Sequence, residues 1–461
     1  MSSTTRFDVY TFATIHASRG IWIILAINSL DSFAYFSTSL NMTLFLTDSL
    51  GVSDARAGHV YAARGVVSSF ALLVSGPLID RWGAHQSLAV GASLVAAGRV
   101  AVVFAHTNWL AVTFFITVLQ SIGAAFMGPA LAICIRRGVS SSAWHPAAYA
   151  LFYSTMNAGA LAAGTVTDIL FRTHASAVAP FVGAALASIA ALTIVVVFPV
   201  PAAAATTIPS PDNTSHSPVA RSWRDSVRHL MLDTNAWLCV GFMTALFWIR
   251  TPFMHMDATF PKYAERVFGH SVDFGLLYAI NPTLIIVGVP FIQSYVVRFD
   301  MYAVITTGTV LAAISPLAVA VWPTYVAGVA AFMITLSLGE AIYSPMTYTY
   351  IMALAPVGRE GVYATVSAAP SIVGAFIVGS MSGHLLADYC PAPDPRHSPL
   401  DDAIDPRLHA YQCARIWIVV AALAAITPFT LVLARRHLYP ASVRDRCQHR
   451  HSETADSIDV Y

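Results

Sequence analysis

Charged side chains occur inside long apolar stretches of a chain in which charge is otherwise scarce. The 461 residues are 56% apolar and 11% charged, whereas about 25% charged residues is usual for soluble proteins. An ionisable side chain inside a membrane-spanning helix costs at least about 2.5–3.5 kcal/mol, so such residues commonly mark functional sites. Three acids and three bases stand well inside apolar segments: Asp31, Arg64, Arg99, Arg250, Asp257 and Glu340. We predict that they line a polar pathway that is neutral overall.

Glu340 lies near the middle of the apolar segment 323–354, at the depth where membrane transporters keep their substrate sites. Ser337, Tyr343 and Ser344 are three or four residues away, so they share its face if the segment is a helix. We predict that Glu340 is a substrate or coupling site, with Arg64 or Arg250 as its counter-charge. The alternative is a carboxylate paired with an arginine for packing alone.

A second titratable group lies in the segment 236–262, where Arg250 and Asp257 are seven residues apart. Seven residues are about two helical turns, so both side chains lie on nearly the same face. Asp257 and His255 are each predicted to titrate in a range useful for coupling, because burial raises the pKa of a carboxylate and lowers that of a histidine. The alternative is that Asp257 is close enough to the outer end of the helix to be solvated.

Neutral polar residues extend the predicted pathway. Asn28, Asp31 and Tyr35 form a stripe at positions i, i+3 and i+7 of an otherwise apolar segment, and such a stripe is costly against lipid. It is therefore predicted to face the interior of the protein. Asn157 and Asn281 add hydrogen-bonding groups, for which a helix–helix bond is an equally good interpretation.

The elements that must position these residues are apolar segments of about 20 residues or more, the length of a membrane-spanning helix. They predict an all-α polytopic membrane protein. Twelve segments are predicted: 20–46, 58–79, 86–105, 108–135, 146–171, 176–199, 236–262, 272–297, 300–321, 323–354, 359–387 and 415–436.

The segments fall into two groups of six. The predicted organisation is a tail at 1–18, a six-helix bundle at 19–199, a linker at 200–235, a second bundle at 236–436 and a tail at 437–461. The linker is rich in Pro, Ala, Ser and Thr, which favours flexibility, and its 221–230 stretch is predicted to be an amphipathic helix at the membrane surface.

Most of the Lys and Arg residues fall on the side of the termini and the linker, which predicts that both termini are cytoplasmic. The inverted orientation is the alternative, and the membrane is either the plasma membrane or that of an organelle. The net charge of +1 argues against a nucleic-acid binder. The sequence contains no hydrolase, metalloprotease or phosphate-loop motif, and no enzyme activity, cofactor or metal is expected.

The connection between the second and third segments reads Gly-Pro-Leu-Ile-Asp-Arg-Trp-Gly over 76–83. It resembles the G-x-L-x-D-R-x-G loop of the major facilitator superfamily, whose fold is two six-helix bundles. Gly76 and Gly83 are expected to allow a tight turn and a close helix approach. Asp80 and Arg81 are expected to form a gating ion pair or to bind a neighbouring helix N-terminus.

Two further stretches resemble the proton-coupled oligopeptide transporters within that superfamily. Residues 152–161 resemble F-Y-x-x-I-N-x-G-S-L, and residues 339–345 with 354–356 resemble G-E-x-x-x-S-P and L-A-P. Where that family carries E-x-x-E-R, this chain has Asn28, Asp31 and Ser32, and Gly128 stands at the position of the family's lysine in G-G-I-K-P.

The resemblance implies a secondary transporter of a small peptide-like or amine-bearing solute, driven by protons through Asp257, Asp31 or Glu340. Its expected partners are that solute, protons and the lipid bilayer, and the chain is expected to be a monomer. A drug-type efflux carrier, or a non-transporting receptor or scaffold with the same fold, are the alternatives.

Two of the five cysteines flank the connection between the last two segments, roughly 388–413. In the predicted orientation this connection is outside the cytoplasm, where disulfides form and persist. We therefore predict a disulfide between Cys390 and Cys413, which would join the outer ends of the last two helices. Two free thiols in a mobile loop are the alternative.

Overall fold

A computed structural model describes residues 18–139, 145–172, 176–198, 232–269, 272–296, 298–355, 360–392, 405–441 and 443–444. These residues are almost entirely helical, and no strand occurs among them. Most of the predicted linker, with its amphipathic helix, lies outside the described residues, as do residues 1–17 and 445–461.

The first half of the chain, up to residue 198, forms six helical stretches. They are α2 (Arg19–Leu44) continued by the π-helix η2 (Phe45–Ser49), α3 (Asp54–Trp82), α4 (Ala84–Phe104), α5 (Trp109–Phe114) continued by η3 (Phe115–Gln120) and α6 (Ser121–Gly138), α7 (His145–Arg172) and α8 (Ala179–Val197).

The second half, from residue 232, repeats this pattern with more interruptions. Its helices are α10 (Thr234–Ala245), η5 (Phe247–Arg250), α11 (Thr251–Ala258), α12 (Phe260–Phe268), α13 (Phe274–Tyr278), α14 (Ile280–Val296), α15 (Met301–Ile314), α16 (Leu317–Val321), α17 (Val326–Leu354), α18 (Glu360–Tyr389) and α19 (Pro406–Leu438).

Nine of the described helical stretches are long and apolar enough to cross a membrane, or ten if the bent pair Thr234–Ala245 and Phe247–Ala258 counts as one span. Helices α7 and α18, with 28 and 30 residues, are also long enough. The chain is thus a multi-pass membrane protein, as predicted, and its helices are consistent with twelve crossings.

One predicted boundary is wrong. The last segment begins at Pro406 instead of 415, because the Asp405 carboxylate caps its first turn by accepting from the Arg407 N–H at 2.9 Å, and proline is favoured in that first turn. Cys413 therefore lies inside α19 and not in the loop before it.

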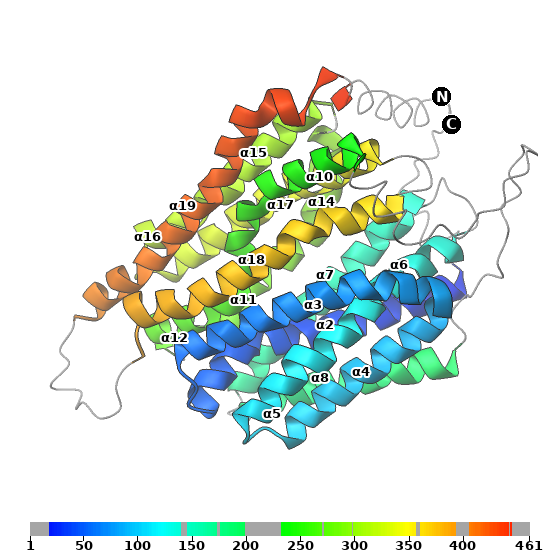
Figure 1. The fold of residues 1–461 in the computed structure, drawn as a ribbon. Helices are drawn as coiled ribbons and strands as arrows, with labels where there is room; N and C mark the ends of the chain where they lie inside the picture. Colours follow the sequence, from blue (N-terminus) through cyan, green and yellow to red (C-terminus); the bar gives the residue numbers. More distant parts are fainter. Residues whose placement is uncertain are drawn as a thin grey trace, which may run out of the picture.

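The helices separate into two groups that lie side by side (Figure 1), with the first half in blue to cyan-green and the second in green to red. The start of α2 and the end of α19 lie at the same end of the bundle. We call this end the terminal side and the opposite end the distal side. Because successive spans alternate in direction, the starts of α3 and α13 and the ends of α7 and α18 are distal.

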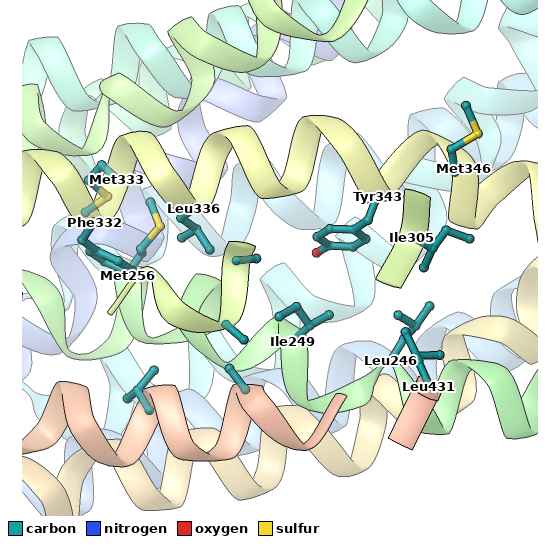
Figure 2. Close-up of a cluster of buried hydrophobic side chains, with 14 of the residues drawn as sticks. Leu246, Ile249, Met256, Ile305, Phe332, Met333, Leu336, Tyr343, Met346 and Leu431 are labelled. Carbon is teal, nitrogen blue, oxygen red and sulfur yellow. The ribbon is translucent and has the colours of Figure 1, made fainter. Parts of the chain in front are cut away.

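Helix α17 is the central helix of the second half. Figure 2 shows apolar side chains of α17 meeting Leu246, which directly follows α10, and side chains of η5, α11, α15 and α19 in one buried cluster. Phe332, Met333 and Leu336 are 0% exposed. The Tyr343 ring points into this cluster, while the charges of Glu340 and Arg250 act on its hydroxyl, so Tyr343 lies near Glu340, as expected from the spacing.

The two halves touch closely where α3 packs against α18 on the distal side. A Cβ atom added at Gly58 would stand 2.6 Å from the Gly379 carbonyl oxygen and 2.8 Å from the Gly383 nitrogen. Gly379 and Gly383 form a G-x-x-x-G pair, a pattern that lets two membrane helices approach backbone to backbone. The close approach of the halves therefore depends on these three glycines.

Of the two glycines of the 76–83 stretch, Gly83 forms the predicted tight turn and Gly76 does not make the predicted close contact. Gly83 has a φ of +88° and ends α3 in a conformation that favours glycine. A Cβ at Gly76, however, would meet nothing within 4 Å. The prediction of a close helix approach at Gly76 is wrong, because the close contact of α3 lies at its other end.

Replacing Gly58 with alanine is expected to weaken the α3–α18 contact, because overpacking a tight site costs about 1–3 kcal/mol. Thermal unfolding of the purified protein in detergent should show a lower melting temperature. Gly76→Ala is the matched control and should be neutral or slightly stabilising, because alanine is the better helix former. Equal melting temperatures for Gly58→Ala and the wild type would contradict the role of this contact.

Candidate functional site

Asp257 on α11 is held by residues of the first half. The Ser39 hydroxyl on α2 donates to Asp257 Oδ2 at 3.3 Å, and Arg64 Nη1 on α3 donates to Ser39 Oγ at 3.2 Å. The Arg64 guanidinium also lies over the Tyr35 ring, 4.6 Å from its centre, a distance that is typical of cation–π contacts. The structure thus brings Asp257, Arg64 and Tyr35 together between the halves.

The second-half neighbour of this group is Tyr278, whose hydroxyl lies near the Asp257 carboxylate. Its ring lies 6.3 Å from that of Phe36 on α2. Asp257 is therefore enclosed by polar groups of both halves and is not solvated at a helix end. A change in the charge of Asp257 therefore alters hydrogen bonds between the two halves.

Glu340 on α17 is the centre of a second polar group. Asn281 Nδ2 on α14 donates to Glu340 Oε2 and to Ser337 Oγ, both at 3.0 Å. The Tyr153 hydroxyl on α7 donates to Glu340 Oε1 at 3.4 Å. Since α7 belongs to the first half, this carboxylate also joins the two halves.

Arg250 lies where the seventh span bends by 47° between α10 and α11, and its side chain is exposed. Its positive charge acts on the Glu340 carboxylate, whereas Arg64 lies with Asp257. Of the two predicted counter-charges of Glu340, the structure therefore favours Arg250.

His255 is apart from these groups. It is 0% exposed, and its Nδ1 lies 2.6 Å from Thr259 Oγ1 on the same segment. Its Nε2 has no partner among the described residues. The structure does not bring His255 into contact with Asp257.

Asp31 has its partner within the first half. Arg99 Nη1 on α4 donates to Asp31 Oδ1 at 3.0 Å and to Ser188 Oγ at 2.7 Å. Asn28, three residues earlier, donates to the Phe152 carbonyl at 2.9 Å and to Thr155 Oγ1 at 3.0 Å. These contacts tie α2 to α4, α7 and α8, so Asn28 and Asp31 face the interior of the first half, whereas Tyr35 lies between the two halves with Arg64.

Asn157 connects to the Glu340 group indirectly, because its Nδ2 donates to the Tyr153 carbonyl at 2.9 Å.

The predicted gating pair is described only in part: Arg81 is exposed on the terminal side, and the side chain of Asp80 lies outside the described residues.

An ionic clamp joins the halves on the distal side. The Asp54 carboxylate at the start of α3 accepts from Lys262 Nζ and from Arg266 Nη2 on α12, both at 2.9 Å. The side chains are largely buried, with exposed fractions of 11%, 1% and 7% respectively. Arg266 Nη1 also donates to the Cys390 carbonyl at 2.6 Å, and Cys390 is joined by a disulfide to Cys413.

A second contact between the halves on the distal side is a helix cap, in which a carboxylate of the first half caps a helix of the second. The Asp168 carboxylate, near the end of α7, accepts from the Gly275 N–H at 2.9 Å and from the Leu276 N–H. A carboxylate at a helix N-terminus satisfies unpaired amides and meets the positive end of the helix dipole. Gly164 and Gly275 allow this contact, since a Cβ on either would lie within 2.4 Å of the other's carbonyl oxygen.

The sequence analysis did not name Ser39, Tyr153 or Asp168 as candidate site residues, although Tyr153 lies in the 152–161 stretch that carries the transporter resemblance. Ser39 and Tyr153 are ordinary residues of apolar helices, and only the three-dimensional packing shows which helix they face. Asp168 is an acid near the end of an apolar segment, which was a usable signal.

The sequence profile of the Major Facilitator Superfamily matches residues 21–383, well over half of the chain. The chain belongs to the Major Facilitator Superfamily. This membership confirms the resemblance carried by the 76–83 loop. No curated protein matches the sequence of this superfamily member at a significant level.

Solved structures of POT family transporters share its fold. One, in complex with sulfate, superposes with a TM-score of 0.68 at 14% identity, over 94% of this chain and 98% of that chain. Another, in complex with a thioalcohol-conjugated peptide, gives a TM-score of 0.66 at 15% identity, over 91% and 97%. A third, with 5-aminolevulinic acid, gives 0.67 at 14%, also over 91% and 97%.

Replacing Asp54 with asparagine is expected to destabilise this superfamily member by about 3–5 kcal/mol, because two largely buried cations lose their partner. Thermal unfolding in detergent measures the loss. The control is Asp300→Asn, which weakens a 3.5 Å pair with the more exposed Arg435 and retains a residue that caps α15 equally well. Exposed pairs contribute about 1 kcal/mol at most, so a similar loss in both variants would argue against the clamp.

Glu265 on α12 gives a prediction for pH. Burial, together with the neighbouring Asp48 carboxyl, raises the pKa of Glu265 from its usual 4.5 to about 7. Ionisation therefore opposes the folded arrangement, and stability falls as the pH rises from about 4.5 to 7 and then levels off. The melting temperature of Glu265→Gln should increasingly exceed that of the wild type over this interval. A difference that stays constant with pH would contradict this assignment.

Proposed function

We propose that the protein is a secondary transporter of a small peptide-like or amine-bearing solute, driven by protons and working by alternating access. The observation that carries the proposal is that two carboxylates lie between the halves, and each is hydrogen-bonded by a residue of the opposite half. Asp257 receives the Ser39 hydroxyl, and Glu340 receives the Tyr153 hydroxyl. A proton or a cationic ligand that neutralises either carboxylate changes how the halves hold together.

Glu340 is the proposed substrate residue. Its side chain is only partly buried, and the donors that reach it, Asn281 and Tyr153, are neutral groups. A protonated amine would form a stronger, charge-assisted bond with the carboxylate than either of them. The exposed Arg250 at the bend of the seventh span would then be available to the carboxylate end of a zwitterionic solute.

Asp257 is the proposed proton-coupling residue. When it is ionised it accepts from Ser39, with the Tyr278 hydroxyl nearby, and Ser39 in turn accepts from Arg64. Protonation removes the charge that orients these donors, and the link from α11 to α2 and α3 weakens. The proton would thus bias the position of the second half relative to the first.

The proposed orientation places the terminal side in the cytoplasm, because the basic residues at the ends of α6 and α19 lie there. The distal side, with its clamp, its cross-half helix cap and its disulfide, then faces the exterior or an organelle lumen. The structure would represent the state closed to that side.

The proposed substrate class is supported by the chemistry of Glu340 and by the POT family structures, two of which contain a peptide conjugate and 5-aminolevulinic acid. Both the acid and most peptides carry an amine and a carboxylate. The sequence resemblance at 339–345 supports the same class.

Replacing Glu340 with glutamine tests the proposal, because it removes the charge that would bind an amine while retaining the size of the side chain. Proteoliposomes with an imposed gradient of about two pH units should accumulate labelled di- and tripeptides or 5-aminolevulinic acid. Glu340→Gln should reduce this flux at least tenfold, with near-normal expression and melting temperature, whereas Asp300→Asn should transport like the wild type. Flux that ignores the pH gradient, or wild-type flux in Glu340→Gln, would overturn the proposal.

A further inference from the structure

Two histidines from opposite halves face each other on the distal side. His59 lies on α3 and His384 on α18, with ring centres 5.7 Å apart and ring planes at 71°. Both side chains are exposed, and no hydrogen bond to either ring occurs within the described residues. The ring nitrogens are therefore available to a ligand.

The backbone holds this pair in place. His59 follows Gly58 and His384 follows Gly383, and these are two of the glycines at which α3 and α18 touch backbone to backbone. The spacing of the rings is thus set by a rigid contact between helices and not by a loop. The two rings have this spacing only while α3 and α18 are in contact, that is, while the distal side is closed.

The pair is within reach of ions from the aqueous phase. His59 is five residues from the distal start of α3, and His384 is five residues from the distal end of α18. Five residues of helix correspond to about 8 Å, which is near the thickness of the polar headgroup layer. The flanking charges, Arg56 one turn from His59 and Asp388 one turn from His384, have opposite signs and offset each other.

The ring spacing suits one tetrahedral metal ion. Zinc binds imidazole nitrogen at about 2.0–2.1 Å in tetrahedral geometry, which places the centres of two bound rings roughly 5–6 Å apart. Neutral imidazole is a common zinc ligand. A pair at 5.7 Å therefore has the ring spacing that one shared ion requires.

We propose that His59 and His384 together bind one divalent transition-metal ion, such as Zn²⁺, which bridges the two halves on the distal side. Water molecules complete the coordination of the ion. Because the ion binds the closed arrangement and not the separated halves, it stabilises that arrangement by mass action. The site acts as a metal-operated lock on the distal side and does not depend on which solute, if any, is transported.

A zinc titration of the purified full-length protein tests the site. Melting temperature is recorded against Zn²⁺ without reductant, because reduced Cys390 and Cys413 beside His409 would form a competing zinc site. The variants are His59→Gln, His384→Gln and the double variant. The matched control is His106→Gln, which changes another exposed histidine on the distal side.

Wild type and His106→Gln should show saturable stabilisation by Zn²⁺. Each single variant should shift the midpoint to an at least tenfold higher zinc concentration. The double variant should have the same midpoint as either single variant, because one ion needs both rings. Single variants with the wild-type midpoint, losses that simply add, or no stabilisation of the wild type up to about 1 mM zinc would overturn the proposal.

A second measurement needs no variant. Zn²⁺ should protect His59 and His384 of the wild type from carbethoxylation by diethyl pyrocarbonate, as read by mass spectrometry, while His106 stays reactive. Equal modification of all three histidines in the presence of zinc would also overturn the site.

Discussion

A carboxylate that lies between the two halves needs compensating groups from both of them. This requirement determines how the halves contact each other. Asp257, Glu340, Asp54 and Asp168 all lie where the first half meets the second, and each accepts a hydrogen bond from the other half. Ionised groups in a low-dielectric interior are costly without such partners. The relative position of the two halves is therefore tied to the charge state of a few carboxylates.

The four carboxylates differ in what holds them, and this difference separates their roles. Asp54 is paired directly with two cations, and Asp168 is bound by two backbone amides of a helix start. In both arrangements the carboxylate charge is compensated by groups in direct contact with it. This suits contacts that hold the distal side closed. Asp257 and Glu340 are instead bound by hydroxyl and amide side chains, which are weaker partners that a proton or a ligand can replace.

The fold was largely predictable from sequence because membrane spans are set by length and hydropathy, which a single chain displays directly. The position of Glu340 among polar groups was predictable as well, since a carboxylate in the middle of a span is costly without such partners. The pairing of Cys390 with Cys413 followed from their common side of the membrane.

What sequence could not supply was the rotation of each helix about its own axis. Asp31 and Asp257 look equivalent in the sequence, yet one pairs with Arg99 inside the first half and the other lies in the joint. The close approach of helices was likewise expected at Gly76, whereas it occurs at Gly58, Gly379 and Gly383. The contacts of Ser39 and Tyr153 depend on which helix each residue faces, and the sequence does not show this.

The cap that Asp168 provides for α13 has a consequence for the order of events when the distal side opens. Separation of α7 from α13 exposes one carboxylate and the amides of Gly275 and Leu276 at the same moment. In a bilayer these groups have no replacement partners except water. Hydration must therefore enter the seam between α7 and α13 before the gap is wide enough for a solute, so opening on this side begins as a wetting transition.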